Sequence, residues 1–156
     1  MKSSAVLSDC LKYRYLLTRE WGDGPAVLFV GLNPSTADAT KDDPTIRRCI
    51  GFAREWGYDR LHMANLFAFR ATKPSDMMDA IDPIGPENDK YLLTLKNDSA
   101  LAVAAWGVHG TFRKRNQDVL EMLPQLHYLQ LTKAGHPSHP LYLPKTLRPI
   151  EWKQEV

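Results

Sequence analysis

Short apolar runs that alternate with helix-like segments are the feature that most constrains this chain. They lie at residues 26–30, 61–66, 101–106 and 127–131, and the first of them, AVLFV, contains no polar residue. A continuous apolar run is typical of a strand that is covered on both faces. Because helix-like segments separate the runs, we expect parallel strands joined by helical crossovers. The sequence therefore predicts an α/β protein, a three-layer α/β/α sandwich with a four-stranded parallel central sheet.

One helix has clear start and stop signals. Asp43 can accept backbone N–H bonds as the N-cap, and Pro44 suits the first helical position. Gly57 is expected to end the helix. Three more helices are expected over residues 75–81, 86–95 and 110–123.

Two further regions lie outside this alternating pattern. Residues 13–21 carry β-formers and run into a Gly-Asp-Gly-Pro turn, which makes them the candidate for an extra antiparallel edge strand. The tail after Gly135 contains four prolines and is expected to be extended and irregular.

Composition narrows the function classes. The chain has 156 residues, which suits one domain over residues 1–156. Twenty Lys+Arg against 18 Asp+Glu leave a net charge of +2, which argues against a polycationic nucleic-acid coat but leaves a local basic patch open. No stretch approaches the roughly 18 apolar residues of a membrane span, and no signal peptide is evident. We therefore expect no membrane partner, and the oligomeric state stays open.

Cysteine and histidine usage bears on location and on metal binding. Cys10 and Cys49 form no CxxC motif, so a reduced cytoplasmic protein is the simplest interpretation. The five histidines show no paired ligand spacing. No metal and no other cofactor is therefore expected.

Polar residues follow each predicted parallel strand. In open α/β sheets ligands bind outside the carboxyl ends of the strands. We therefore expect the four segments at these strand ends to converge, although they lie far apart in the chain. These segments are residues 31–38, 65–72, 107–110 and 133–143.

The first segment begins Gly31-Leu32-Asn33-Pro34-Ser35 and is predicted to bind substrate. Gly31 permits a close approach of backbone or ligand, and Asn33 offers both hydrogen-bond donors and an acceptor. Pro34 restricts the backbone of Asn33 and so holds its side chain in place. The alternative is a turn in which Asn33 and Ser35 satisfy their own backbone.

In the second segment Asn65 ends a strand, where its amide can pair with the donor–acceptor edge of a nucleobase. Phe67 either stacks on a base or packs in the core. Arg70 is a candidate phosphate contact, with a solvated surface charge as the alternative.

In the third segment Gly107 and Gly110 flank His109 in a compact turn that leads into a helix. Gly107 and His109 are predicted to contact substrate. Arg113 and Lys114 are expected in the first turns of that helix, where cations oppose the helix dipole. They are therefore candidates for nucleic-acid contacts, although an exposed helix face explains them almost as well.

The fourth segment contains two His-Pro units three residues apart, which hold the imidazoles of His136 and His139 on a stiff backbone. An imidazole can donate to a developing oxyanion or stabilise it by charge. Ser138 between them is a further binding candidate. Half-buried histidines that only make hydrogen bonds are the alternative.

Taken in order, GLNPS, the strand that ends in Asn65, AAWGVHG and HPSHPL resemble the uracil-DNA glycosylase superfamily. The resemblance implies a uracil-DNA glycosylase-like sandwich and an activity that cleaves the N-glycosidic bond of a nucleobase. It also implies that Asn33 handles the hydrolytic water, that Asn65 reads the base and that His136 stabilises the departing base. No match is found for the stacking Phe of that superfamily.

A closer resemblance extends along the chain. The tracts GLNPSTAD, DDPTIRRC, NLFAFRAT, DPIGPEND and AAWGVHG are similar to a bacterial and phage family known only as a domain of unknown function. Three hypotheses follow. The chain either hydrolyses an N-glycosidic bond, or binds a nucleobase, nucleotide or nucleic acid without cutting it, or uses these loops only to stabilise a fold whose partner is another protein.

Overall fold

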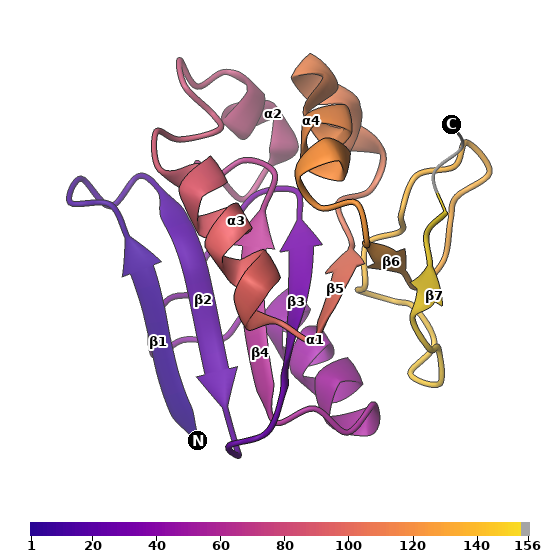
Figure 1. Cartoon of the computed structure of the whole chain (residues 1–156). Helices are drawn as coiled ribbons and strands as arrows, with labels where there is room; N and C mark the ends of the chain where they lie inside the picture. Colours follow the sequence, from indigo (N-terminus) through magenta and orange to yellow (C-terminus); the bar gives the residue numbers. More distant parts are fainter. Residues whose placement is uncertain (154–156) are drawn as a thin grey trace.

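One mixed β-sheet organises the protein, and the computed structural model describes residues 1–153 of it (Figure 1). Within these residues the sheet has seven strands in the order β1-β2-β4-β3-β5-β6-β7. Strands β4, β3, β5 and β6 pair in parallel, and the pairs β1–β2, β2–β4 and β6–β7 are antiparallel. The strands are β1 (Lys2–Leu7), β2 (Arg14–Glu20), β3 (Ala26–Gly31), β4 (Arg60–Asn65), β5 (Leu101–Ala104), β6 (His127–Tyr128) and β7 (Ile150–Glu151).

The sheet is larger than the predicted four-stranded parallel sheet. Residues 13–21 do supply an antiparallel strand, β2, but β1 lies outside it and forms the edge. The sequence KSSAVL of β1 is half polar and largely exposed, so it lacks the apolar signal of a covered strand. Strand β7 has only two residues and lies in the proline-containing tail. The four predicted runs thus supply the four parallel strands, and the antiparallel strands β1, β2 and β7 extend the sheet to seven.

Helices cover both faces of the sheet. Helix α1 (Pro44–Glu55) packs on one face, and α2 (Pro74–Met78), α3 (Asn88–Asp98) and α4 (Arg115–Met122) pack on the other (Figure 1). Asp43 caps α1 as predicted, because its Oδ1 accepts the backbone N–H of Ile46 at 2.9 Å.

The helix expected over 110–123 is in fact two pieces. A 3₁₀ segment, η1 (Val108–Lys114), precedes α4. At the end of η1, Arg113 and Lys114 both adopt a φ of 54°, which is left-handed and interrupts the helix. These two cations therefore lie at a break, not in the first turns of a helix as the sequence analysis expected.

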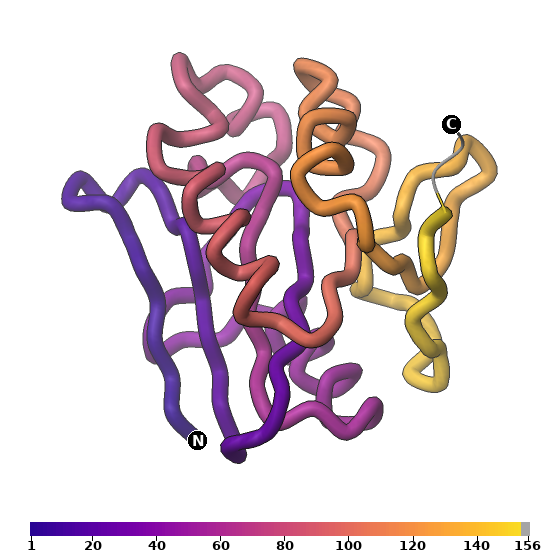
Figure 2. Tube along the Cα trace, viewed as in Figure 1, coloured from indigo at the N-terminus to yellow at the C-terminus, as the bar shows by residue number. Residues whose placement is uncertain are grey.

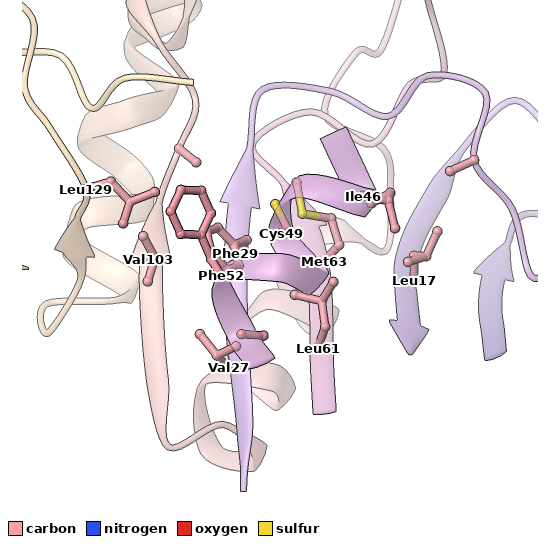
Figure 3. Packing of buried hydrophobic residues seen from close by; sticks show 13 residues of the cluster. Leu17, Val27, Phe29, Ile46, Cys49, Phe52, Leu61, Met63, Val103 and Leu129 are labelled. Carbon is pink, nitrogen blue, oxygen red and sulfur yellow. The ribbon is translucent and has the colours of Figure 1, made fainter. Parts of the chain in front are cut away.

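Strand β3 shows why its sequence is apolar throughout. Val27 and Phe29 join the hydrophobic cluster under α1, which also contains Cys49 and Phe52 (Figure 3). Leu28 and Val30 join the cluster under α3 and α4. Alternate side chains of a strand point to opposite faces, so a strand covered by helices on both faces needs apolar residues at every position.

The segment after β6 folds back beside the sheet. Figure 2 follows it from orange to yellow, past β6 and back to β7. Leu131 and Pro137 form an isolated antiparallel bridge in this segment, which turns the chain toward the carboxyl end of the sheet. Across residues 1–153, no helix combines the length and the apolar character that crossing a bilayer requires. The same residues contain no group of three or more His, Cys, Asp or Glu placed to hold a metal.

Acidification is expected to destabilise the fold through His62 of β4. This side chain is buried and bonds Thr18 Oγ1 through Nδ1 at 2.9 Å. Burial lowers the pKa of His62 below its ordinary 6.5, and Arg60 adds to this shift, while Asp98 and Glu20 oppose it. Because the unfolded chain then binds the proton more readily than the folded protein does, the contribution of His62 to stability is full above pH 6.5. It falls as the pH drops below 6.5. Urea unfolding at pH 8 and pH 5.5 measures the loss, and His62→Gln should reduce it. An unchanged pH dependence in the variant would contradict this assignment.

Candidate functional site

A cavity of about 500 Å³ lies at the carboxyl ends of β3, β4 and β5. This volume is within the roughly 300–1,000 Å³ of ordinary ligand pockets. All four predicted strand-end segments contribute to its wall, together with the N-terminus of α1. From the predicted set, the lining residues are Gly31, Leu32, Asn33, Pro34, Ser35, Asn65, Gly107, His109 and His139.

A second hollow of about 750 Å³ lies along α1, between the helix and residues 141–146. Its wall contains Arg47, Arg48 and Lys145, and it shares Leu141 with the cavity. None of the residues predicted from sequence lines it, so the smaller cavity is the candidate site.

Asn65 is the most informative residue of the cavity wall. Its side chain is only 2% exposed, yet its Nδ2 has no hydrogen-bond partner among residues 1–153. A buried amide that lacks a partner costs free energy, and buried polar groups are normally satisfied. A ligand that supplies an acceptor to this Nδ2 removes that cost.

The backbone around Asn65 is held rigidly. Asn88 Nδ2 donates to the carbonyl oxygens of Asn65 and Leu66, each at 3.0 Å. Arg115 Nε donates to the same Leu66 oxygen at 2.9 Å and also pairs with Asp89. These contacts come from α3 and the start of α4. The two helices therefore hold the backbone from which the Asn65 side chain projects.

Gly31 is the neighbour that makes room for this amide. In the parallel register Gly31 lies opposite Asn65. A Cβ at position 31 would lie 2.8 Å from Asn65 Oδ1 and 2.9 Å from Met63 Cε, closer than real Cβ atoms come to other groups. A side chain at position 31 would therefore displace the Asn65 amide and the end of the Met63 side chain, whereas Gly31 leaves room for both.

Asn33 is oriented by its own loop. Its Nδ2 donates to Ala71 O at 2.9 Å and to Pro34 O at 3.2 Å, and the Ala71 N–H donates to Pro34 O at 2.9 Å. Because the amide nitrogen is engaged, Oδ1 is the atom left for a ligand or a water. The amide nitrogen of Asn33 thus serves its own loop, as in the turn alternative, while its Oδ1 has no hydrogen-bond partner within residues 1–153.

His139 supplies an imidazole to the cavity wall. Its Nδ1 accepts the backbone N–H of Leu141 at 3.2 Å, so the neutral ring carries its proton on Nε2. His139 is exposed to solvent, and the partial desolvation that its neighbours still impose lowers its pKa below the ordinary value, while the charge of Asp43 opposes that shift. Near pH 7 the ring is therefore a neutral donor.

Asp43 is the one carboxylate among the described residues that line the cavity. Its Oδ1 caps α1 through the N–H of Ile46. Its Oδ2 has no partner within residues 1–153, so it is free to accept a proton or a hydrogen bond.

His136 and Ser138 lie outside the cavity wall. The His136 backbone pairs with Thr132, whose N–H donates to His136 O at 2.8 Å, and the Ser138 N–H donates to Gln130 O at 2.8 Å. These backbone hydrogen bonds pair the first His-Pro unit with residues 130–132. The second unit, His139 and Pro140, lines the cavity. The two units look alike in sequence, and only the fold distinguishes His139 from His136.

The remaining predicted residues also lie away from the cavity wall. Phe67 is fully buried in the core, with its ring centroid 5.7 Å from that of Phe112, which is the core-packing alternative. Arg70 Nη1 donates to Leu11 O at 3.2 Å. Arg113 lies over the Phe112 ring, and Lys114 is exposed. Their contact with nucleic acid stays a prediction.

On the rim, His109 is exposed and Gly107 has a φ of 71°. The Gly107 N–H donates to Pro137 O at 2.8 Å, which ties the third segment to the fourth. A positive φ suits glycine at this junction.

Arg14 also lines the cavity, although no feature of the sequence singled it out. Its side chain is 2% exposed, with Nη1 donating to Ala37 O at 3.0 Å. Burial lowers the pKa of Arg14 to about 10, Asp43 opposes this shift, and Arg70 adds to it. The signal that could have found Arg14 is topological. The first residue of an antiparallel strand lies at the edge where its parallel neighbours end.

The fold and the cavity together define an α/β protein with a ligand-sized site at the carboxyl end of its parallel strands. Residues 14–141 match the family described as "Protein of unknown function (DUF1643)", and the chain belongs to this family. Searches of curated proteins and of solved structures found no match.

Proposed function

We propose that the cavity binds a nucleobase and that the protein hydrolyses the N-glycosidic bond of that base in a nucleotide or nucleic acid. The observation that carries the proposal is the buried, unpartnered amide of Asn65 in a wall that also presents Asn33 and His139. An amide pairs with the donor–acceptor edge of a base. The motif resemblance to uracil-DNA glycosylases supports the same reaction, and the glycosylase-like sandwich that it implies is part of the proposal.

In the proposed reaction the C1′–N bond breaks and its electron pair stays with the base. The Nε2–H of His139 donates to the base oxygen on which negative charge develops. A water held by Asn33 Oδ1 adds to C1′, and Asp43 accepts the proton that this water loses. Asp43 releases that proton to solvent, and the departing base anion takes one up.

A binding module that does not cut its ligand is the second candidate. It is favoured by the commitment of Asn33 Nδ2 to Ala71 O and Pro34 O, which ties half of this amide to loop structure. In such a binding module Asn65 and His139 bind the base, and no covalent bond breaks.

A single-turnover assay of free-base release tests the proposal on a panel of DNA with uracil or other modified bases and of nucleosides and nucleotides. We expect release by the wild type and a loss of about 100-fold in His139→Ala, because one oxyanion donor is removed. Asp43→Asn should also slow release while it keeps the helix cap, since Asn caps as well as Asp. The matched control is His127→Ala, on β6 and outside the cavity wall.

Three outcomes decide between the hypotheses. Loss of activity in His136→Ala but not in His139→Ala would return the imidazole role to His136. Calorimetric binding that Asn65→Ala abolishes, with no product across the panel, would establish the binding module. Neither binding nor release across the panel would overturn both functions.

A further inference from the structure

We propose that Arg14 forms an anion subsite in the cavity and that the ligand is a nucleoside monophosphate, held by its phosphate as well as by its base. The nucleobase part of this inference rests on the proposed function. The anion subsite rests on separate observations, which concern Arg14 and the start of α1.

The guanidinium of Arg14 is buried without a carboxylate partner. Within residues 1–153 no Asp or Glu oxygen lies within 4.0 Å of it, and its single hydrogen bond goes to Ala37 O. Its Nε is buried with no acceptor at all. The two other buried arginines differ, since Arg19 pairs with Asp42 and Arg115 pairs with Asp89. A buried charge is expensive unless it is paired, so Arg14 lacks a counter-charge that its two counterparts have.

The N-terminus of α1 adds to the positive potential at the same wall. Thr45 and Ile46 of its first turn line the cavity with Arg14. The helix has 12 residues, and its N-terminus carries positive partial charge. Pro44 has no N–H, and the Ile46 and Arg47 N–H groups already bond Asp43, so the Thr45 N–H is the one in the first turn that an anion could use. The Thr45 hydroxyl has no hydrogen-bond partner in the described part of the chain, so it is available to an anionic oxygen.

Asp43 is the opposing charge at this wall, and it does not neutralise Arg14 directly. It lies farther than 4.0 Å from the guanidinium, because no such ion pair forms, and its Oδ1 is engaged by the Ile46 N–H. An anion that reaches Arg14 is therefore attracted by the guanidinium and repelled by Asp43, which among the charged residues affects the pKa of Arg14 most. This predicts that removal of the Asp43 charge strengthens anion binding.

The cavity also has room for more than a base. At about 500 Å³ it lies well inside the range for drug-sized ligands, and its base-binding groups come from β3, β4 and the fourth segment. Arg14 comes from β2, on the other side of β4 from β3. Base and phosphate would therefore occupy neighbouring parts of one cavity.

Calorimetric titration of the full chain tests the subsite with matched ligands that carry the same base. These are the free base, the nucleoside, the nucleoside 5′-monophosphate, an oligonucleotide without a terminal phosphate, and inorganic phosphate and acetate alone. We expect the monophosphate to bind at least about tenfold more tightly than the nucleoside, as a charge-assisted hydrogen bond allows. In Arg14→Gln that advantage disappears and nucleoside affinity stays within about threefold. In Asp43→Asn, which keeps the helix cap, the advantage grows.

The outcomes separate this inference from the proposed function. Equal affinity for nucleoside and monophosphate would overturn the anion subsite and leave the nucleobase function intact. Phosphate binding that Arg14→Gln abolishes, with no base or nucleoside bound, would support the subsite and overturn the nucleobase function. Preference for the oligonucleotide over the monophosphate would overturn the assignment to a terminal phosphate. If Arg14→Gln fails to fold, the Asp43→Asn result and competition of inorganic phosphate against the monophosphate in the wild type still decide.

Discussion

Asn65→Ala is expected to weaken binding of the ligand by about 10- to 100-fold and to leave the free energy of unfolding within about 0.5 kcal/mol of the wild type. The reason is that the Asn65 Nδ2 makes no hydrogen bond within residues 1–153, so its removal breaks no internal hydrogen bond and relieves a buried unpaired donor. In the complex the same group would pair with the base edge. Calorimetric titration and urea unfolding measure the two effects separately.

Asn88→Ala is the matched control for that prediction. Asn88 is equally buried, but its Nδ2 already bonds the carbonyl oxygens of Asn65 and Leu66. Its removal leaves two buried acceptors with fewer partners, and we expect a loss of about 2 kcal/mol of stability. The interpretation of Asn65 as a ligand-binding group fails if Asn65→Ala destabilises the protein as much as Asn88→Ala and leaves ligand affinity unchanged.

Arg19→Ala is expected to cost about 3 kcal/mol of stability or more, the largest effect on folding that we predict. Arg19 is 1% exposed, and its Nε contacts Asp42 Oδ1 at 2.8 Å. Its Nη2 donates to Asp38 O at 2.6 Å and to Lys41 O at 3.3 Å. These bonds hold the loop that leads from the first strand-end segment to the N-terminus of α1.

Urea unfolding measures this loss, and Arg47→Ala provides the control. Arg47 is exposed on α1, and its one side-chain hydrogen bond, to Asp42 O, is long at 3.4 Å, so a change below about 0.5 kcal/mol is expected. Because the loop held by Arg19 borders the cavity, the variant should also bind ligand less tightly at temperatures where it is still folded. If Arg19→Ala and Arg47→Ala both lose less than about 0.5 kcal/mol of stability, the loop does not depend on Arg19.

Local signals in the sequence were enough to predict part of the fold. The helix start at Asp43 and Pro44 depends on neighbouring residues only, and the structure confirms it. The apolar run at 26–30 predicts a strand covered on both faces because each of its side chains must be buried. Weakly patterned elements such as β1 and β7 gave no comparable signal, because exposed or very short strands bury little apolar surface.

The residues of the site also divide into those that the sequence places and those that only the tertiary structure places. The positions of Asn33 and Asn65 at strand ends follow from the sequence, since the carboxyl ends of parallel strands meet at one edge. The choice of His139 over His136, the burial of Phe67 in the core and the arrival of Arg14 at the cavity depended on the tertiary structure. Each of these is set by contacts between residues far apart in the chain, which local residue preferences do not specify. The sequence by itself therefore determined which strands end in polar groups, and only the packing of β2, α1 and the fourth segment decided which side chains share the cavity.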